Sequence, residues 1–199
     1  MAGMGSGLNS AAFTVAVVGP DVYAGGYFTD AGGDPNADRI ARWDGSAWHA
    51  LGSGLNDGVQ AIAAVGPNVY VGGYFTDAGG LANADRIARW DGTAWHALGS
   101  GVNAAARAIT VAGPSLYVGG DFTDAGGGPN ADYIARWDGS AWHALGSGLN
   151  GNVHALAVAG PDVYVGGNFG NAGGNPDANL IARWGTVFNY VYLPLAVRN

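Results

Sequence analysis

Short apolar runs alternate along the chain with turns that are rich in Gly, Asp and Asn. Residues 153–159 form one such run, and after a Gly-Pro-Asp turn a second run, 163–165, ends in Gly166 and Gly167. In the preceding stretch, residues 134–137 and 141–145 flank an Asp-Gly-Ser turn. Runs of this length between turn residues predict strands, and an Asp-Gly turn between two of them predicts a hairpin. We therefore expect groups of four short strands and no helical segments.

This pattern repeats every 47 residues. The first two units, 4–50 and 51–97, are identical at 34 of 47 positions. Four strands in about 40–50 residues are typical of a propeller blade, whereas leucine-rich and ankyrin repeats are shorter and contain helices. The sequence predicts an all-β fold, a single β-propeller domain over residues 1–199. Its expected blades are 4–50, 51–97, 98–144 and 145–193, with a C-terminal tail, 194–199.

The way in which the ring closes remains open at this point. The fourth unit follows the repeat as far as Trp184 and then departs from it. Residues 187–193 alternate in character and are expected to form the outer strand of the last blade, with Pro194 preventing further pairing. Four blades can close into a ring within a monomer, which is the favoured interpretation. Alternatively, two chains can complete an eight-bladed ring as a homodimer.

The repeat resembles the kelch-type blade. The residues that carry the likeness are the segment VYVGG at 69–73, followed by Trp90 in the third strand and Trp95 in the fourth. The spacing between the two aromatic positions is shorter than in the usual kelch motif, so the unit is similar to a kelch-like variant and to repeats of secreted bacterial propellers. The resemblance covers about 185 residues and implies the fold. It implies little about function, because propellers serve as enzymes, lectins and scaffolds.

Composition narrows the possible partners. The chain has 37 Gly, all 15 anionic residues are Asp, all eight cationic residues are Arg, and there is no Cys, which gives a net charge of −7. An acidic chain with scattered Arg is not expected to bind nucleic acid, and no apolar run approaches the ~18 residues of a membrane span. No signal peptide is expected within the chain. Most of the charge repeats the turn chemistry of one blade, so it says little about partners.

No catalytic set is apparent. The Ser residues occur in turns without a supporting His–Asp pair, Glu is absent, and no phosphate-binding glycine motif precedes a helix. We therefore expect a non-enzymatic protein without a cofactor, with calcium as the one exception to consider. Asp34, Asn36 and Asp38 have a spacing at which oxygen ligands converge on Ca²⁺, and Asp30 is a possible fourth ligand. The other units break this pattern, so turn-closing hydrogen bonds are the favoured interpretation.

Aromatic residues at the fourth strand suggest a second kind of site. Trp48, Trp95 and Trp142 could stack on sugar rings, with one site per blade, and the blade has the size found in tachylectin-type propeller lectins. Packing within and between blades is the favoured role. The Arg residue of each third strand is expected to pair with the Asp two positions later or to stack on Trp. The His residue after each of these Trp residues is expected to be solvated.

The most informative positions are those at which nearly identical units disagree. One position in the first strand is different in every unit, and a second variable set follows each glycine pair: Phe13, Gln60, Arg107 and His154, then Tyr27, Tyr74, Asp121 and Asn168. Propellers place the first strand innermost, so the first set is expected at the mouth of the central channel, where unlike groups can form a ligand site. Drift at exposed positions after duplication is the favoured alternative.

The leading functional prediction is a non-enzymatic binding or structural module of a secreted or cell-surface protein, which recognises protein or glycan. The alternatives are a multivalent lectin with one site per blade and a self-assembling half-propeller.

Overall fold

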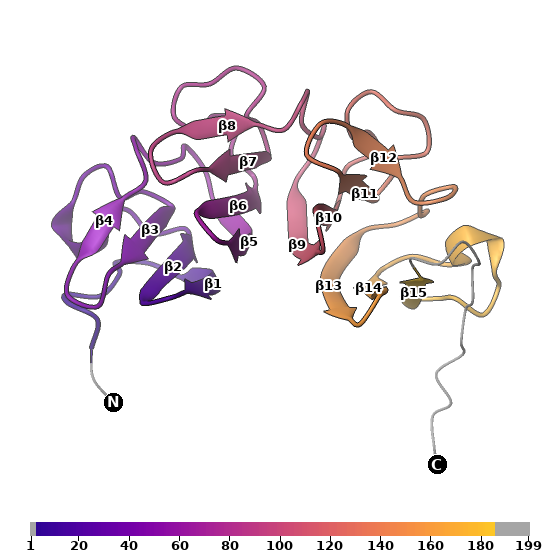
Figure 1. Ribbon diagram of the computed structural model, residues 1–199, viewed down its shortest axis with the longest axis horizontal. Helices are drawn as coiled ribbons and strands as arrows, with labels where there is room; N and C mark the ends of the chain where they lie inside the picture. The colour runs from indigo at the N-terminus through magenta and orange to yellow at the C-terminus, as the bar shows by residue number, and fades with distance from the viewer. Residues whose placement is uncertain (1–2, 186–199) are drawn as a thin grey trace, which may run out of the picture.

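The computed structural model describes residues 3–185, which form antiparallel sheets with two short 3₁₀ turns (Figure 1). The first sheet contains β1 (Ala12–Val18), β2 (Asp21–Gly26), β3 (Ile40–Trp43) and β4 (Trp48–Ala50). The second contains β5 (Val59–Val65), β6 (Asn68–Gly73), β7 (Ile87–Trp90) and β8 (Trp95–Ala97). The third contains β9 (Ala106–Ala112), β10 (Ser115–Gly120), β11 (Ile134–Trp137) and β12 (Trp142–Ala144). The fourth contains β13 (Val153–Ala159), β14 (Asp162–Gly167) and β15 (Ile181–Gly185), and the turns are η1 (Ala31–Gly33) and η2 (Ala172–Gly174).

Each sheet is a meander in which consecutive strands are neighbours. This confirms the predicted all-β fold and the four-stranded repeat unit in the first three blades. The fourth blade has three strands among the described residues, and the outer strand predicted at 187–193 lies outside them. No helix in residues 3–185 is long and apolar enough to cross a membrane.

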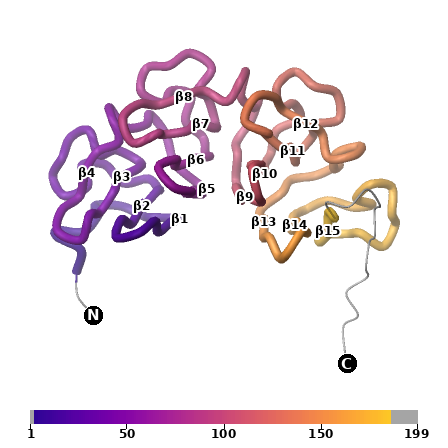
Figure 2. Tube along the Cα trace, in the orientation of Figure 1, coloured from indigo at the N-terminus to yellow at the C-terminus, as the bar shows by residue number. Residues whose placement is uncertain are grey.

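The blades stand side by side in an arc. The first strands β1, β5, β9 and β13 contact one another in chain order and line the inner side, while β4, β8 and β12 lie on the outer side (Figure 1). The chain passes from one end of the arc to the other, so the first and last blades lie on either side of its open side (Figure 2). Each blade therefore packs against its neighbours along the chain.

Contacts between blades depend on the first glycine of each pair. A Cβ on Gly25 would lie 2.4 Å from Cγ1 of Val59 and 3.0 Å from Cδ1 of Ile62, both on the inner strand of the next blade. The same strand position places Ile109 against Gly72. Because a larger residue would displace these side chains, Gly at this position lets the next blade pack closely. The apolar clusters follow the same plan, since Tyr23 and Ile40 of the first blade share one cluster with residues of the second.

The second glycine of each pair has a different role. A Cβ on Gly26, Gly73, Gly120 or Gly167 would lie only 2.0–2.2 Å from the carbonyl oxygen of the residue that precedes the inner strand. This close approach of two backbones accompanies a shift in the register between the first and second strands of every blade. The glycine pair thus serves two constraints, one between blades and one within the blade.

Candidate functional site

The variable residue of the first strand lies at a β-bulge in every blade. In the second blade, Val59 is paired with Gly73 and Ala61 with Gly72, so Gln60 is the extra residue between them. The same register shift brackets the equivalent residues of the other three blades: Phe13, Arg107 and His154. A bulge leaves one residue outside the regular ladder and redirects its side chain. The variable position is visible in the sequence, whereas the bulge is visible only in the pairing of the strands.

The second variable set lies directly beside the first. The backbone amide of the residue after each glycine pair donates to a carbonyl next to the bulge, as Tyr74 does to Gly58 at 2.9 Å. Side chains of the two sets also meet within a blade. The rings of Phe13 and Tyr27 are 5.3 Å apart in an edge-to-face arrangement, and Arg107 binds Asp121 through two contacts of 2.7 Å. We call these eight residues the bulge cluster.

The bulge cluster also connects neighbouring blades. The guanidinium of Arg107 lies 5.4 Å from the ring centroid of Tyr74, which belongs to the preceding blade. The Asp121 carboxylate, through its hydrogen bond to Arg107, raises the pKa of that guanidinium above its ordinary value. Phe13 is 50% exposed and His154 is exposed, while Gln60 and Arg107 are half-buried. The cluster therefore offers aromatic edges, an imidazole and an amide, while its cation is largely neutralised by its own carboxylate.

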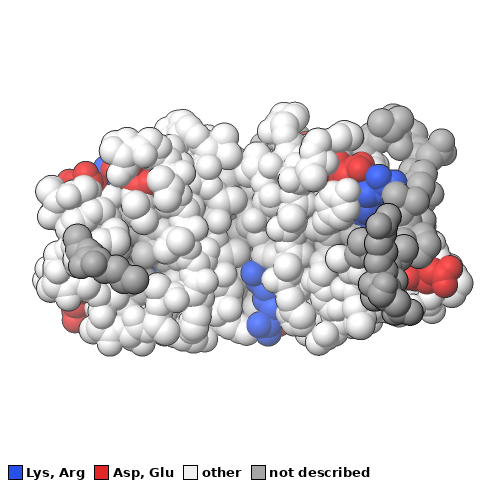
Figure 3. All heavy atoms as spheres, turned by 90° about the horizontal axis from the view of Figure 1, so that it is seen from below, with Lys and Arg blue, Asp and Glu red and all other residues white. Residues whose placement is uncertain are grey.

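The surface on the open side of the arc carries few charges. Cationic atoms appear near its middle and again near the right-hand end beside carboxylates, carboxylates also lie at the left-hand end, and most atoms between them are uncharged (Figure 3). Arg107 is the only cationic residue on the four inner strands. A strongly charged ligand would find little to bind on this side, apart from ion pairs that are already formed.

The Trp residues proposed for sugar stacking lie elsewhere, on the outer strands. Trp95 is 5% exposed, and its indole Nε1–H donates to the Leu51 carbonyl at 2.9 Å. Its ring centroid lies 5.4 Å from that of Trp90. Trp48 and Trp142 repeat both interactions and are half-buried. Each indole N–H tethers the outer strand of a blade to the first residue of its own 47-residue unit. The buried ring of Trp95 offers little surface to a sugar.

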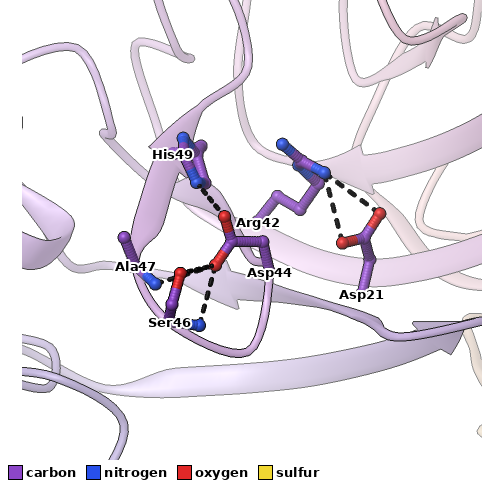
Figure 4. Close-up of polar contacts among 6 residues, drawn as sticks. All are labelled: Asp21, Arg42, Asp44, Ser46, Ala47 and His49. Carbon is purple, nitrogen blue, oxygen red and sulfur yellow. Dashed lines mark hydrogen bonds and ion pairs between the residues drawn. The ribbon is translucent and has the colours of Figure 1, made fainter.

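In the outer hairpins, the third-strand Arg does not pair with the Asp two positions later, contrary to what the sequence had suggested. Nε2 of His49 lies 2.6 Å from Oδ2 of Asp44, and the other oxygen of Asp44 accepts hydrogen bonds from Ser46 and Ala47 (Figure 4). The expected partner, Arg42, binds Asp21 on the neighbouring strand at 3.1 Å. The carboxylate two positions later is occupied by its own turn, so it does not pair with the Arg residue. The His49 side chain is 42% exposed, as expected of a solvated residue, and it also contacts the turn carboxylate.

The same hydrogen bonds shift the acidity of the turn carboxylates. The Ser46 hydroxyl, the amides of Ala47 and Ser46 and the His49 ring hold the pKa of Asp44 far below its ordinary value of 3.8. The pKa values of Asp91 and Asp138 are lowered in the same way, and the largest contributions come from hydrogen bonds donated by the backbone amides of Ala94 and Ala141 respectively. These residues stabilise hairpins and are spread along the outer side of the arc.

The residues proposed for calcium take part in turn hydrogen bonds. Oδ1 of Asp34 accepts from the amide of Asn36, and Oδ1 of Asp38 accepts from the amide of Asp30, both at 3.0 Å. Within residues 3–185, no group of three or more His and Asp side chains is arranged to hold a metal ion. The geometry is that of the turn interpretation, and calcium binding stays a prediction.

Comparisons with known proteins address the fold. No protein-family model matches the chain, and no curated protein matches it significantly in sequence. Among solved structures, the computationally designed Ika4 protein matches with a TM-score of 0.58 and 15% identity, over 91% of this chain and 94% of that chain. The fold is a β-propeller. The kelch-like assignment of its repeat stays a prediction.

Two longer proteins contain a similar arrangement. The computationally designed Ika8 protein matches with a TM-score of 0.57 and 18% identity over 93% of this chain. A chain of the mitotic checkpoint complex matches with a TM-score of 0.56 and 16% identity over 91% of this chain. This chain spans 49% and 51% of those chains, about half of each. At such identities the likeness concerns the fold alone.

Proposed function

We propose that this propeller is a non-enzymatic binding module and that the bulge cluster is its ligand-binding surface. The observation that carries the proposal is that the one first-strand position that differs in all four blades is the bulge residue. Because a bulge residue is outside the ladder, it can change without disturbing the sheet, and bulges elsewhere often redirect side chains at functional sites. Unlike side chains on a repeated frame give an asymmetric surface, which is what selective recognition requires.

Drift after duplication is a weaker explanation of this pattern. The outer hairpins contain exposed positions that have not diverged. Ala47, Ala94 and Ala141 are all exposed and identical. The bulge residues, by contrast, range from aromatic to cationic, and Arg107 is matched by an Asp121 carboxylate that no other blade has at that position. A coordinated change of two contacting residues supports selection on the cluster.

The chemistry of the cluster favours a protein segment or a glycan of low net charge. Phe13 and Tyr27 offer apolar edges on the first blade, and Gln60 and His154 offer hydrogen-bonding groups on the second and fourth blades. Mixed surfaces of this kind suit both classes of ligand. An extracellular or cell-surface location is part of the proposal and rests on the likeness of the repeat to secreted bacterial propellers.

The test is selection of a ligand followed by substitution. The chain is screened against a displayed peptide library and a glycan array, and the tightest ligand is titrated by calorimetry. We expect Phe13→Ala, Gln60→Ala and His154→Ala together to weaken binding by at least about tenfold, since each lost contact contributes about 1 kcal/mol. Arg107 is retained because its removal would leave Asp121 half-buried without its partner.

The matched control carries three alanines on the outer side of the arc, at His49, His96 and His143. This variant should bind as the wild type does. Unchanged affinity of the bulge variant for every selected ligand would refute the proposal, as would equal losses in both variants.

A further inference from the structure

The two end faces of the arc expose apolar residues that the repeat buries elsewhere. On the last blade, Ile181 is 47% exposed, whereas Ile134 at the same place in the preceding blade is 3% exposed. On the first blade, Val15 is 65% exposed, whereas Ile62 at the same place in the next blade is 8% exposed. These faces are therefore the two halves of a blade–blade contact that lacks its partner within residues 3–185.

The two faces have complementary shapes. At each internal contact, an apolar residue of the inner strand lies over the first glycine of the preceding blade, as Ile62 lies over Gly25. On the last blade the equivalent glycine is Gly166, and within residues 3–185 no atom lies closer than 3.8 Å to the position of its Cβ. On the first blade, Val15 has the position of Ile62 but no preceding blade to cover. One end thus has the unfilled hollow, and the other has the residue that fills it.

We propose that a second copy of this chain covers these faces. The first blade of each copy packs on the last blade of the other, so that Val15 lies over Gly166 of the second copy as Ile62 lies over Gly25. Two equal head-to-tail contacts of this kind close a ring of eight blades with twofold symmetry. The contact continues an interface that already occurs three times within the chain, with residues of the same types.

The course of the arc supports two copies. The end faces lie apart across the open side, and the exposure of Ile181 and Val15 shows that they do not cover each other within one chain (Figure 1). The same arrangement of blades also superposes on half of the longer Ika8 chain, with a TM-score of 0.57. Four blades arranged in this way therefore also occur as part of a longer chain. This inference does not depend on the ligand of the bulge cluster.

The experiment measures solution mass by light scattering over a range of concentrations. The wild-type chain is expected at twice its mass of 20.0 kDa. Val15→Glu and Gly166→Glu each place a carboxylate in one half of the contact, and each is expected to give the single-chain mass. Within residues 3–185 both positions have free space beside them, so circular dichroism melts should show that the variants fold. Ala94→Glu, on an exposed outer turn, adds the same charge and should leave the doubled mass unchanged.

The outcomes separate the alternatives. A doubled mass that both end-face variants abolish supports the two-chain ring. A wild-type mass of 20 kDa at all concentrations overturns it, because the end faces are then covered within one chain or left open. A mass that rises beyond two chains with concentration, or a doubled mass that survives both substitutions, overturns it as well.

Discussion

Replacing Trp95 with alanine provides the sharpest test of the role assigned to the outer-strand Trp residues. The side chain is 5% exposed, and its ring packs on Trp90 with a centroid distance of 5.4 Å. The Gly79 backbone also lies close to the ring, since a Cβ there would lie 2.6 Å from Cδ1 of Trp95. A ring enclosed in this way stabilises the blade, so we expect its removal to destabilise the fold.

The magnitude follows from the contacts. Truncation of a buried Trp to Ala typically lowers the free energy of unfolding by about 3–5 kcal/mol. Of this, the aromatic pair contributes about 0.5–1.5 kcal/mol. Trp95→Phe keeps most of the burial but removes the indole N–H. Because the Gly54 amide also donates to the Leu51 carbonyl, at 3.2 Å, that oxygen keeps one donor. The Phe variant should therefore lose about 1 kcal/mol for the missing hydrogen bond, with a further loss for the smaller ring.

The assay is urea denaturation followed by far-ultraviolet circular dichroism, which does not depend on the fluorescence of the remaining Trp residues. We expect the unfolding midpoints to fall in the order wild type, Trp95→Phe, Trp95→Ala, with similar slopes. A loss below about 1 kcal/mol for Trp95→Ala would refute the structural role. Loss of glycan binding in such a stable variant would favour the lectin alternative instead.

Two further predictions use the repeat as its own control. Gly119→Ala should lower the free energy of unfolding by about 1–3 kcal/mol, because its Cβ would lie 2.3 Å from Cγ1 of Val153. In dilute single chains, Gly166→Ala should raise the free energy of unfolding by less than about 1 kcal/mol. Equal losses of stability for Gly119→Ala and Gly166→Ala in a denaturation assay would contradict the packing argument. Asp91 has a lowered pKa in the folded state, so its stabilising effect is present above its unfolded pKa, near 3.8, and is lost as pH falls below that value. Asp91→Asn should therefore lower the melting temperature at pH 6, and the difference should shrink towards pH 2; a difference independent of pH would refute this assignment.

Local pattern was sufficient to predict the strands and their order. The run predicted at 153–159 is β13, and the third strand predicted at 134–137 is β11. These segments have turn residues at both ends and apolar residues between them, so their structure depends mainly on neighbours in sequence. The fourth strand is shorter than predicted, because Ala141 belongs to the turn closed by Asp138.

Interactions that depend on register could not be predicted in the same way. Arg42 is paired in register with Tyr23, which brings it next to Asp21 on the adjacent strand. The sequence suggested Asp44 as the partner instead, because a sequence shows only the separation of residues along the chain and not their separation in space. The bulge was missed for a similar reason: only the pairing of two strands shows that one residue is extra. Whether the two ends of the arc meet depends on the sum of the angles between successive blades. The sequence of a single repeat unit does not determine that sum.

The glycine pair connects these levels of structure. Its second glycine admits the carbonyl beside the bulge and so belongs to the proposed ligand site. Its first glycine admits the inner strand of the next blade and so belongs to the packing between blades. Gly166 is the first glycine of the last pair, and no blade packs over it within the described residues. The residue is still Gly, although the fourth unit has changed at many neighbouring positions. The proposed second copy would supply this cause, because its first blade would restore at Gly166 the contact that Gly25, Gly72 and Gly119 make within the chain.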